Sequence, residues 1–315
     1  MKAAVLNAYG QVPQYQDFPA PTPQNDNEIL VRPKAASIKQ LDIIKAAGKH
    51  YTNFDPLPAV MGMDGVAQLN DDVLVYANGV TGMMAEQAII DKRTMLPLPD
   101  GLDIAVAASI PNTLSGSDGA LTIQGKIKSG DVVLVNGATG ATGTMAVQMA
   151  KYRGASFVIA TGRNEATLAE LRQHGADATI NLQQDDELVK ADLKQIYAQS
   201  PIDLVVDYLW GRPAELILST FGELQLSVPV RYVSIGQMAG ATITLPSQLL
   251  RSRNVTLVGS GIGSIPAPIL HDYLQKTLPE IFDYAAAGHL YLQPKVASLN
   301  QVAQVWSKGQ SVLEM

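Results

Sequence analysis

The chain contains no cysteine in its 315 residues. That absence excludes disulfides, thiolate zinc sites, cysteine nucleophiles and cysteine-ligated iron–sulfur clusters. Histidine is scarce as well, and no pair of histidines has the HxxxH or HExxH spacing of a metal site. The four stand far apart, at His50, His174, His271 and His289. The sequence therefore predicts that no metal is bound.

Long apolar runs and an excess of positive charge are also missing. No apolar run reaches the roughly 18 residues needed to cross a bilayer, and the apolar start Met1–Leu6 is too short for a signal peptide. The net charge of −6 leaves no basic surface for binding nucleic acid independently of its sequence. We expect a cytoplasmic protein with no membrane and no nucleic-acid partner.

The composition is that of folded domains, with 47% hydrophobic and 17% charged residues. About the first hundred residues alternate between polar and apolar in short segments separated by Pro and Gly, which is typical of an irregular antiparallel barrel. The expected elements are strands at 3–7, 28–36, 72–76 and 85–90, and a helix at 40–47.

Beyond Asp103 the pattern changes to alternating strands and helices. This alternation predicts an α/β fold with a doubly wound parallel sheet. Six strands are expected at 131–136, 156–160, 178–181, 202–207, 231–235 and 254–259. The helices are expected at 141–153, 165–174, 185–199, 212–221 and 268–288. The short tail after them is too small to fold alone, so we expect it to return to the first domain.

A glycine-rich loop follows the first of these strands and opens a helix. Its glycines are spaced three and three, a variant of the dinucleotide fingerprint, in which glycines permit a tight turn and close approach of a pyrophosphate. The alternative is an ordinary glycine-rich loop. The expected cofactor-binding residues here are Gly137, Thr139, Gly140, Ala141, Thr142 and Gly143.

The ends of the second and fourth strands carry further candidates. An NAD-binding fold places an acidic residue after strand two, whereas this chain has Thr161, Gly162 and Arg163. An arginine there suits the 2′-phosphate of NADP, and the alternative is a solvated surface arginine. Asp207 ends strand four, where ligands bind in such sheets, although it could instead cap the following helix.

Over nearly its whole length the chain resembles the zinc-independent quinone oxidoreductase branch of the medium-chain dehydrogenase/reductase family. The similar segments are Ala36–Asp42, Pro58–Gly65, Leu96–Leu102, the glycine loop, Asp203–Gly211 and Tyr232–Gly236. The resemblance implies a GroES-like catalytic domain from residues 1–108 and 267–315 and a Rossmann domain from 109–266. It also implies a homodimer formed through the strand at 254–259, and adds Asn181, Gly236 and Gln237 to the expected NADPH contacts.

Zinc-containing members of this family hold the metal with a Cys and a Gly-His-Glu segment. Here those positions are Lys39 and Gly62-Met63-Asp64, which do not suit Zn²⁺. The resemblance then implies metal-free hydride transfer from NADPH to a quinone or an α,β-unsaturated carbonyl. We expect Lys39, Tyr51 and Ser37 to be the hydrogen-bond donors near the substrate oxygen.

Several alternatives remain open at this stage. Lys39 could be a surface lysine, Tyr51 a core-edge tyrosine, and Asp42 a structural residue that orients the adjacent backbone or pairs with Lys39. The nicotinamide-side threonine of the family aligns with Gly116, so Ser115 or Ser117 would have to substitute. The competing functions are an enoyl-thioester reductase of the same family and a non-catalytic NADPH-binding redox sensor.

Overall fold

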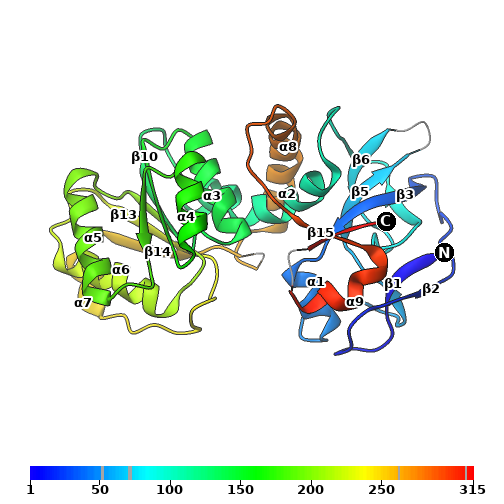
Figure 1. Cartoon of the computed structure of the whole chain (residues 1–315), viewed down its shortest axis with the longest axis horizontal. Coiled ribbons are helices and arrows are strands. Elements are labelled where there is room, and N and C mark those ends of the chain that lie inside the picture. Colours follow the sequence, from blue (N-terminus) through cyan, green and yellow to red (C-terminus); the bar gives the residue numbers. More distant parts are fainter. Residues whose placement is uncertain (51–52, 70–72, 262, 309–310) are drawn as a thin grey trace. The chain divides into compact units, whose positions relative to one another are not determined.

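The computed structural model describes residues 1–50, 53–69, 73–261, 263–308 and 311–315. Unit 1 combines residues 1–112 with residues 275–315, and unit 2 is residues 113–274. Helices α2 (Ile104–Gly116) and α8 (Ala267–Ala286) each run from one unit into the other. Both termini labelled in Figure 1 therefore belong to unit 1.

Unit 1 consists mainly of short strands. They are β1 Lys2–Leu6, β2 Gln14–Asp17, β3 Glu28–Ser37, β4 Ala59–Val60, β5 Asp64–Gln68, β6 Leu74–Asn78, β7 Ala88–Asp91, β8 Leu96–Pro97, β15 Lys295–Ser298 and β16 Ser311–Glu314. One sheet has the order β2–β1–β4, and another has the order β15–β16–β3–β5–β6–β8, with β7 also paired to β3. The predicted irregular barrel is confirmed.

The C-terminal strand completes the pairing of an N-terminal one. Strand β16 pairs antiparallel with β3, with Val312 opposite Ser37. The core beneath these strands is apolar and includes Leu6, Ile38, Met61 and Trp306. Helix α1 (Gln40–Ala46) follows directly on β3, and the short α9 (Val302–Val305) precedes β16.

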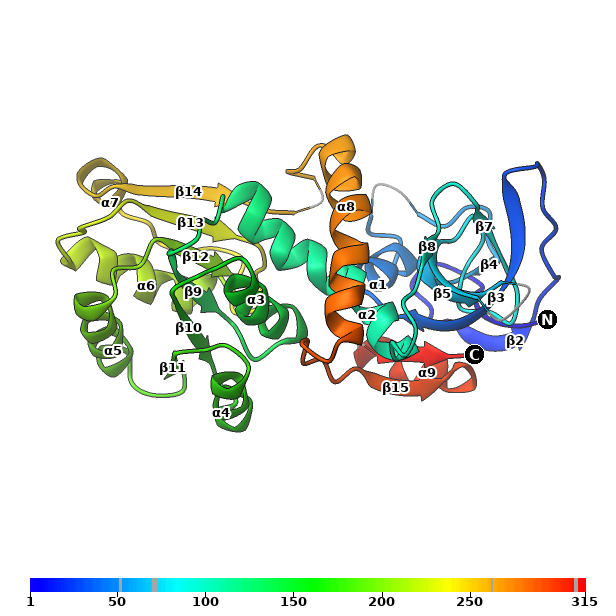
Figure 2. The same cartoon turned by 90° about the horizontal axis from the view of Figure 1, so that it is seen from above.

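Unit 2 contains a parallel sheet of six strands. They are β9 Val132–Asn136, β10 Phe157–Gly162, β11 Ala178–Asn181, β12 Leu204–Asp207, β13 Val230–Ser234 and β14 Val255–Gly259. Their order is β11–β10–β9–β12–β13–β14, and Figure 2 shows them one beside the next. This order reverses direction between β9 and β12, as in the doubly wound dinucleotide-binding fold. The predicted Rossmann sheet is confirmed.

Helices cover both faces of this sheet. They are α3 Ala141–Tyr152, α4 Glu165–Gln173, α5 Asp186–Gln199, α6 Gly211–Glu223 and α7 Ser247–Ser252. Helices α5 and α6 lie on one side and α3 and α4 on the other (Figure 1). Among the described residues, every helix is too short or too polar to span a bilayer.

Sequence patterns did not predict helices α2 and α7. Helix α2 begins after Asp103, whose carboxylate accepts hydrogen bonds from the backbone N–H groups of Ala105 and Val106 at 2.9 Å each. It also contains Pro111, a residue that ordinarily marks the end of a helix. Helix α7 has only six residues, too few to show a helical period.

Candidate functional site

The glycine loop makes a tight turn between β9 and α3. Gly137 has a φ of +90°, a conformation that favours glycine. A Cβ on Gly143 would lie 2.3 Å from the carbonyl oxygen of Gly137, so helix and loop touch there. Each of these two glycines is therefore required by the backbone itself, as the fingerprint predicts.

The N-terminus of α3 remains open above this turn. Gly140 is its N-cap residue, no side chain caps it, and its first turn contains no acidic residue. A Cβ placed on Gly140 would meet only the Gly137 oxygen, at 3.9 Å. Uncapped N–H groups at the positive end of a 12-residue helix, with open space beside Gly140, suit an anionic group such as a pyrophosphate.

A buried polar network lies beneath the loop, where three strands end. The side chain of Asn136 donates to Asp207 Oδ1 at 2.7 Å and accepts from the Thr161 hydroxyl at 2.7 Å. The Tyr232 hydroxyl donates to Asp207 Oδ2 at 2.8 Å. These four side chains are at most 1% exposed. The network links the carboxyl ends of β9, β10 and β12 with Tyr232 in the middle of the neighbouring β13.

Asp207 is the centre of this network. Its carboxylate also accepts the backbone N–H groups of Leu209 at 2.8 Å and Trp210 at 3.2 Å. Burial raises the pKa of Asp207, and these hydrogen bonds to its charged form oppose that rise. Because protein donors already occupy both oxygens, the geometry favours a positioning role for Asp207 over direct contact with a ribose.

The end of β10 presents an exposed cation. Arg163 lies at the surface, and no ion pair or hydrogen bond in the described part of the chain engages its guanidinium. Gly162 before it packs against Thr139, because a Cβ at position 162 would lie 2.4 Å from that side chain. Asn164 caps α4 by accepting from Thr167 N at 3.1 Å, so its amide oxygen is already used.

The remaining predicted residues are placed along the same edge. Asn181 ends β11 opposite Gly162, and its side chain accepts from Gln183 N at 2.9 Å. Ala141 and Thr142 begin α3, with the Thr142 methyl near Gly116. Gly236 and Gln237 follow β13, and Gln237 is exposed. The structure thus brings the predicted cofactor residues to the carboxyl edge of one sheet, whereas the hydroxyl of Thr161 faces inward.

A second polar cluster lies in unit 1, where β3 leads into α1. The ammonium of Lys39 pairs with Asp64 Oδ2, which also accepts from the Tyr76 hydroxyl at 2.7 Å. Asp42 caps the turn by accepting from Lys39 N at 2.9 Å. All four residues are buried, so Lys39 is not a surface lysine.

Burial dominates the electrostatics of this cluster. It raises the pKa of Asp42 to about 6 from 3.8, because Lys39 offsets the desolvation only in part. It also raises the pKa of Tyr76, which stays protonated as a donor to Asp64. Within the described residues, Oδ1 of Asp42 and Oδ1 of Asp64 have no hydrogen-bond partner.

The structure says less about the other residues that were predicted to lie near the substrate or the nicotinamide. Tyr51 lies outside the described residues. Ser37 is 6% exposed, at the end of β3. Of the proposed threonine substitutes, Ser117 donates its hydroxyl to Thr113 O at 2.6 Å and is fully buried, so it serves its own helix.

Sequence reasoning missed Asn136, Tyr232 and Tyr76. A signal existed for Asn136, since it is the polar end of an apolar strand directly before the glycine loop. Tyr232 and Tyr76 lie within buried strands, and their partners are 25 and 12 residues away along the chain. Such pairings depend on the register of the folded sheets and leave no local pattern.

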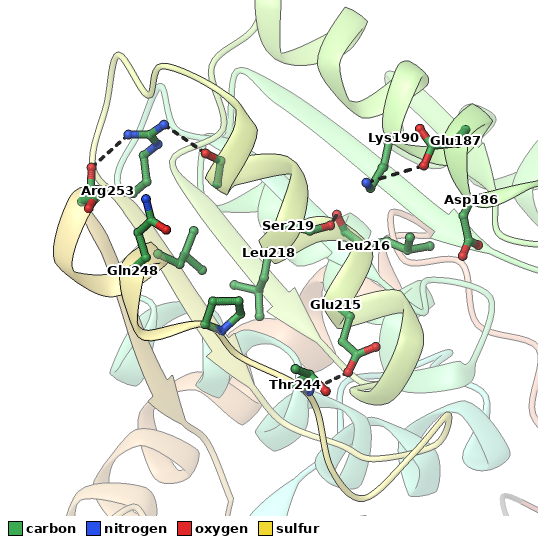
Figure 3. A pocket seen from close by; sticks show the side chains of 14 residues that line it. Asp186, Glu187, Lys190, Glu215, Leu216, Leu218, Ser219, Thr244, Gln248 and Arg253 are labelled. Atoms are coloured by element: carbon green, nitrogen blue, oxygen red, sulfur yellow. Dashed lines mark hydrogen bonds and ion pairs between the residues drawn. The ribbon is translucent and has the colours of Figure 1, made fainter.

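Unit 2 contains a cavity of about 510 Å³ whose lining does not include the buried network around Asp207. It runs along α6, between α5 and the segment that includes α7, with Lys190, Glu215 and Arg253 on its walls (Figure 3). None of its lining residues belongs to the glycine loop or to the ends of β10, β12 and β13. We therefore do not assign the dinucleotide to this cavity.

Known proteins resemble this chain in both sequence and structure. A family model described as zinc-binding dehydrogenase matches residues 141–282. Quinone oxidoreductase-like protein 2 of Rattus norvegicus is 27% identical over 268 residues, which are 82% of this chain and 74% of that protein. The chloroplastic NADPH-dependent alkenal/one oxidoreductase of Arabidopsis thaliana is 29% identical over 204 residues, or 58% of this chain and 52% of that protein.

A solved structure has the same fold over the full length of the chain. The quinone oxidoreductase from Thermus thermophilus, also determined with NADPH, covers 100% of both chains with 26% identity and a TM-score of 0.76. These similarities support placing the chain with the medium-chain dehydrogenase/reductase family. Within this family it groups with the quinone oxidoreductases, and it is an oxidoreductase.

The zinc-ligand positions of medium-chain dehydrogenases/reductases do not fit zinc in this chain. The ammonium of Lys39 is paired with Asp64, and Met63 offers a thioether sulfur that lies 3.7 Å from Lys45 Nζ. Neither group replaces a thiolate or an imidazole on Zn²⁺. In the described ranges, no three His, Asp or Glu side chains come close enough together to hold a metal ion.

Proposed function

We propose that this medium-chain dehydrogenase/reductase transfers hydride from NADPH to a quinone or an α,β-unsaturated carbonyl without a metal. One observation carries the proposal. The uncapped N-terminus of α3 lies beside open space at Gly140, and the exposed Arg163 follows the end of the adjacent strand. A pyrophosphate and a 2′-phosphate are the two anions that such an arrangement suits.

Different parts of unit 2 would bind different parts of NADPH. The N–H groups at the start of α3 would hold the pyrophosphate, and Arg163 would pair with the 2′-phosphate of the adenosine half. The loops after β12 and β13 would lie on the nicotinamide side, since a dinucleotide binds where the strand order reverses, here between β9 and β12. NADPH, when bound, supplies the hydride, and the acceptor takes up one proton to give NADP⁺ and the reduced product.

Lys39 is the proposed hydrogen-bond donor to the substrate oxygen. Its ammonium has three N–H donors, and the pair with Asp64 occupies one of them. A cationic donor stabilises negative charge that develops on a carbonyl oxygen during hydride addition. This assignment rests on the family resemblance at residues 36–42, and that of Tyr51 rests on its place after this segment.

The test follows NADPH oxidation by absorbance with a panel of quinones and alkenals, with and without a metal chelator. We expect turnover that survives the chelator. Arg163→Ala should raise the Kd for NADPH roughly ten- to a hundredfold and leave that for NADH nearly unchanged, because one charge-assisted pair is lost. Arg172→Ala, on the exposed face of α4, is the matched control. Equal losses for NADPH and NADH would contradict the proposal.

A redox sensor that binds NADPH without turnover is the second candidate. The buried pairing of Lys39 with Asp64 favours it, since this pairing restrains the proposed donor. NADPH binding without oxidation by any acceptor in the panel would support the sensor.

We also propose a homodimer formed through β14. This strand lies at the edge of the sheet, with Thr256 exposed and one side unpaired within the described chain. Edge strands of this kind pair readily with a second copy.

A further inference from the structure

The loops after β12 and β13 form one hydrogen-bonded platform on the proposed nicotinamide side. Met238 N donates to Tyr208 O at 3.3 Å, and Ala239 N donates to Leu209 O at 2.8 Å. A Cβ on Gly236 would lie 2.5 Å from Tyr208 O, so the two loops are in direct contact. The second loop is therefore held in place by the first.

The first loop is itself held in an unusual conformation. Trp210 has φ +56° and ψ −156°, a region that is essentially restricted to glycine. Its N–H donates to Asp207, and its ring packs edge-on to Tyr232 at 6.5 Å between centroids. The buried network and the indole packing together hold this strained residue. Such strain is a marker of functional loops when the surrounding structure enforces it.

Met238 projects from the platform into solvent. It is 83% exposed, more than any other large hydrophobic residue in the described chain. The surrounding segment 235–243 contains no charged residue. An exposed thioether on a fixed, neutral loop offers a polarizable apolar surface, which suits an aromatic ring better than a charged ligand.

We propose that Met238 contacts the ring of the electron acceptor and favours fused-ring quinones over single-ring ones. The inference rests on the proposed function, because it places the acceptor beside the nicotinamide half at the ends of β12 and β13. A flat quinone ring stacked on the nicotinamide half of the cofactor would meet the Met238 side chain, which this loop holds outward. A fused second ring would extend the contact with the methionine sulfur and methyl group.

The experiment compares 1,4-naphthoquinone with 1,4-benzoquinone on the full chain. Met238→Gln keeps the length of the side chain and removes its apolar end. It should raise the KM for naphthoquinone roughly three- to tenfold, raise that for benzoquinone less, and leave the Kd for NADPH unchanged. Met238→Leu should lose less than Met238→Gln. Leu188→Gln changes another exposed hydrophobic residue, on α5, and is the matched control with no expected effect.

Binding to the NADP⁺-loaded protein, measured by calorimetry, separates this inference from the proposed function. If wild type turns over neither these quinones nor any acceptor of the wider panel, the proposed function fails, but a weaker naphthoquinone Kd in Met238→Gln still supports the contact. Equal changes for both quinones, or none, overturn the inference. It is also overturned if wild type binds no naphthoquinone, or if Met238→Gln changes the oligomeric state, which would make the surface a contact between copies.

Discussion

At the scale of single residues, a buried ion pair in unit 1 makes the stability of the protein sensitive to substitution. Lys39 and Asp64 are 5% and 6% exposed and form an ion pair. A buried pair of this kind adds little net stability, because desolvation costs about as much as the attraction returns. Removing one partner is far more costly, since the other charge is then left alone in the interior.

Lys39→Met should therefore destabilise the protein by about 3–5 kcal/mol. The double variant Lys39→Met/Asp64→Asn should recover much of that loss, because neither charge then remains, and the introduced amide oxygen can still accept from Tyr76. Urea denaturation of both variants measures the difference. Strictly additive losses would show that the two side chains act independently. The double variant also separates the activity of Lys39 from its effect on folding.

Asp42 predicts a pH dependence of stability. Its pKa is about 6 in the folded protein, above the ordinary 3.8, so the folded state binds the proton more tightly. The resulting stabilisation is complete below pH 4 and is lost as the pH rises to about 6, amounting to about 3 kcal/mol. Asp42→Asn should lack this slope, so the difference in unfolding free energy between wild type and variant should change by about 3 kcal/mol between pH 4 and 7. Parallel profiles from pH 4 to 7 would contradict the assignment.

At the scale of elements, the turn from β9 into α3 contains glycines that its backbone requires and one glycine, Gly140, for which we predict a role in binding NADPH. Gly143→Ala would place its Cβ 2.3 Å from Gly137 O, so we expect a loss of about 1–3 kcal/mol in stability. Gly140→Ala meets nothing closer than 3.9 Å and should cost less than about 1 kcal/mol. Its methyl group would nevertheless occupy the open space, raising the Kd for NADPH roughly tenfold or more.

Thermal melts and NADPH titrations of the two variants check this separation. Both replace a glycine of the same loop by alanine, so each serves as the control for the other. A Gly140→Ala protein that binds NADPH like wild type would show that the open space is not the pyrophosphate site.

Apart from α7, the main strands and helices of unit 2 could be predicted from the sequence because each has a local pattern. Each strand is a short apolar run, and the glycine loop lies within eight residues between a strand and a helix. Helix α2 was not predicted because Pro111 interrupts an apolar stretch of the sequence. In the site, Arg163 and the glycines could be read from position alone. The pairing of Lys39 with Asp64 could not, because it joins residues 25 apart whose proximity depends on the folded barrel.

At the scale of the whole molecule, the edge of the parallel sheet sets the expected assembly. Light scattering should give twice the chain mass of 33.6 kDa. Thr256→Lys places a charge on β14 and should yield the monomer, because a lysine on an edge strand opposes pairing with a second strand. A monomeric wild type, or an unchanged dimer in the variant, would contradict the proposed interface.

The pairing of β16 with β3 also has a consequence for biosynthesis. About 270 residues separate Ser37 from the strand that pairs with it. At 5–20 residues per second, the ribosome needs roughly 15–55 s to make them. Throughout that time this edge of β3 lacks its native neighbour, although the whole of unit 2 has already emerged and can fold. The nascent barrel is then the species most exposed to aggregation, and the one on which chaperones would act.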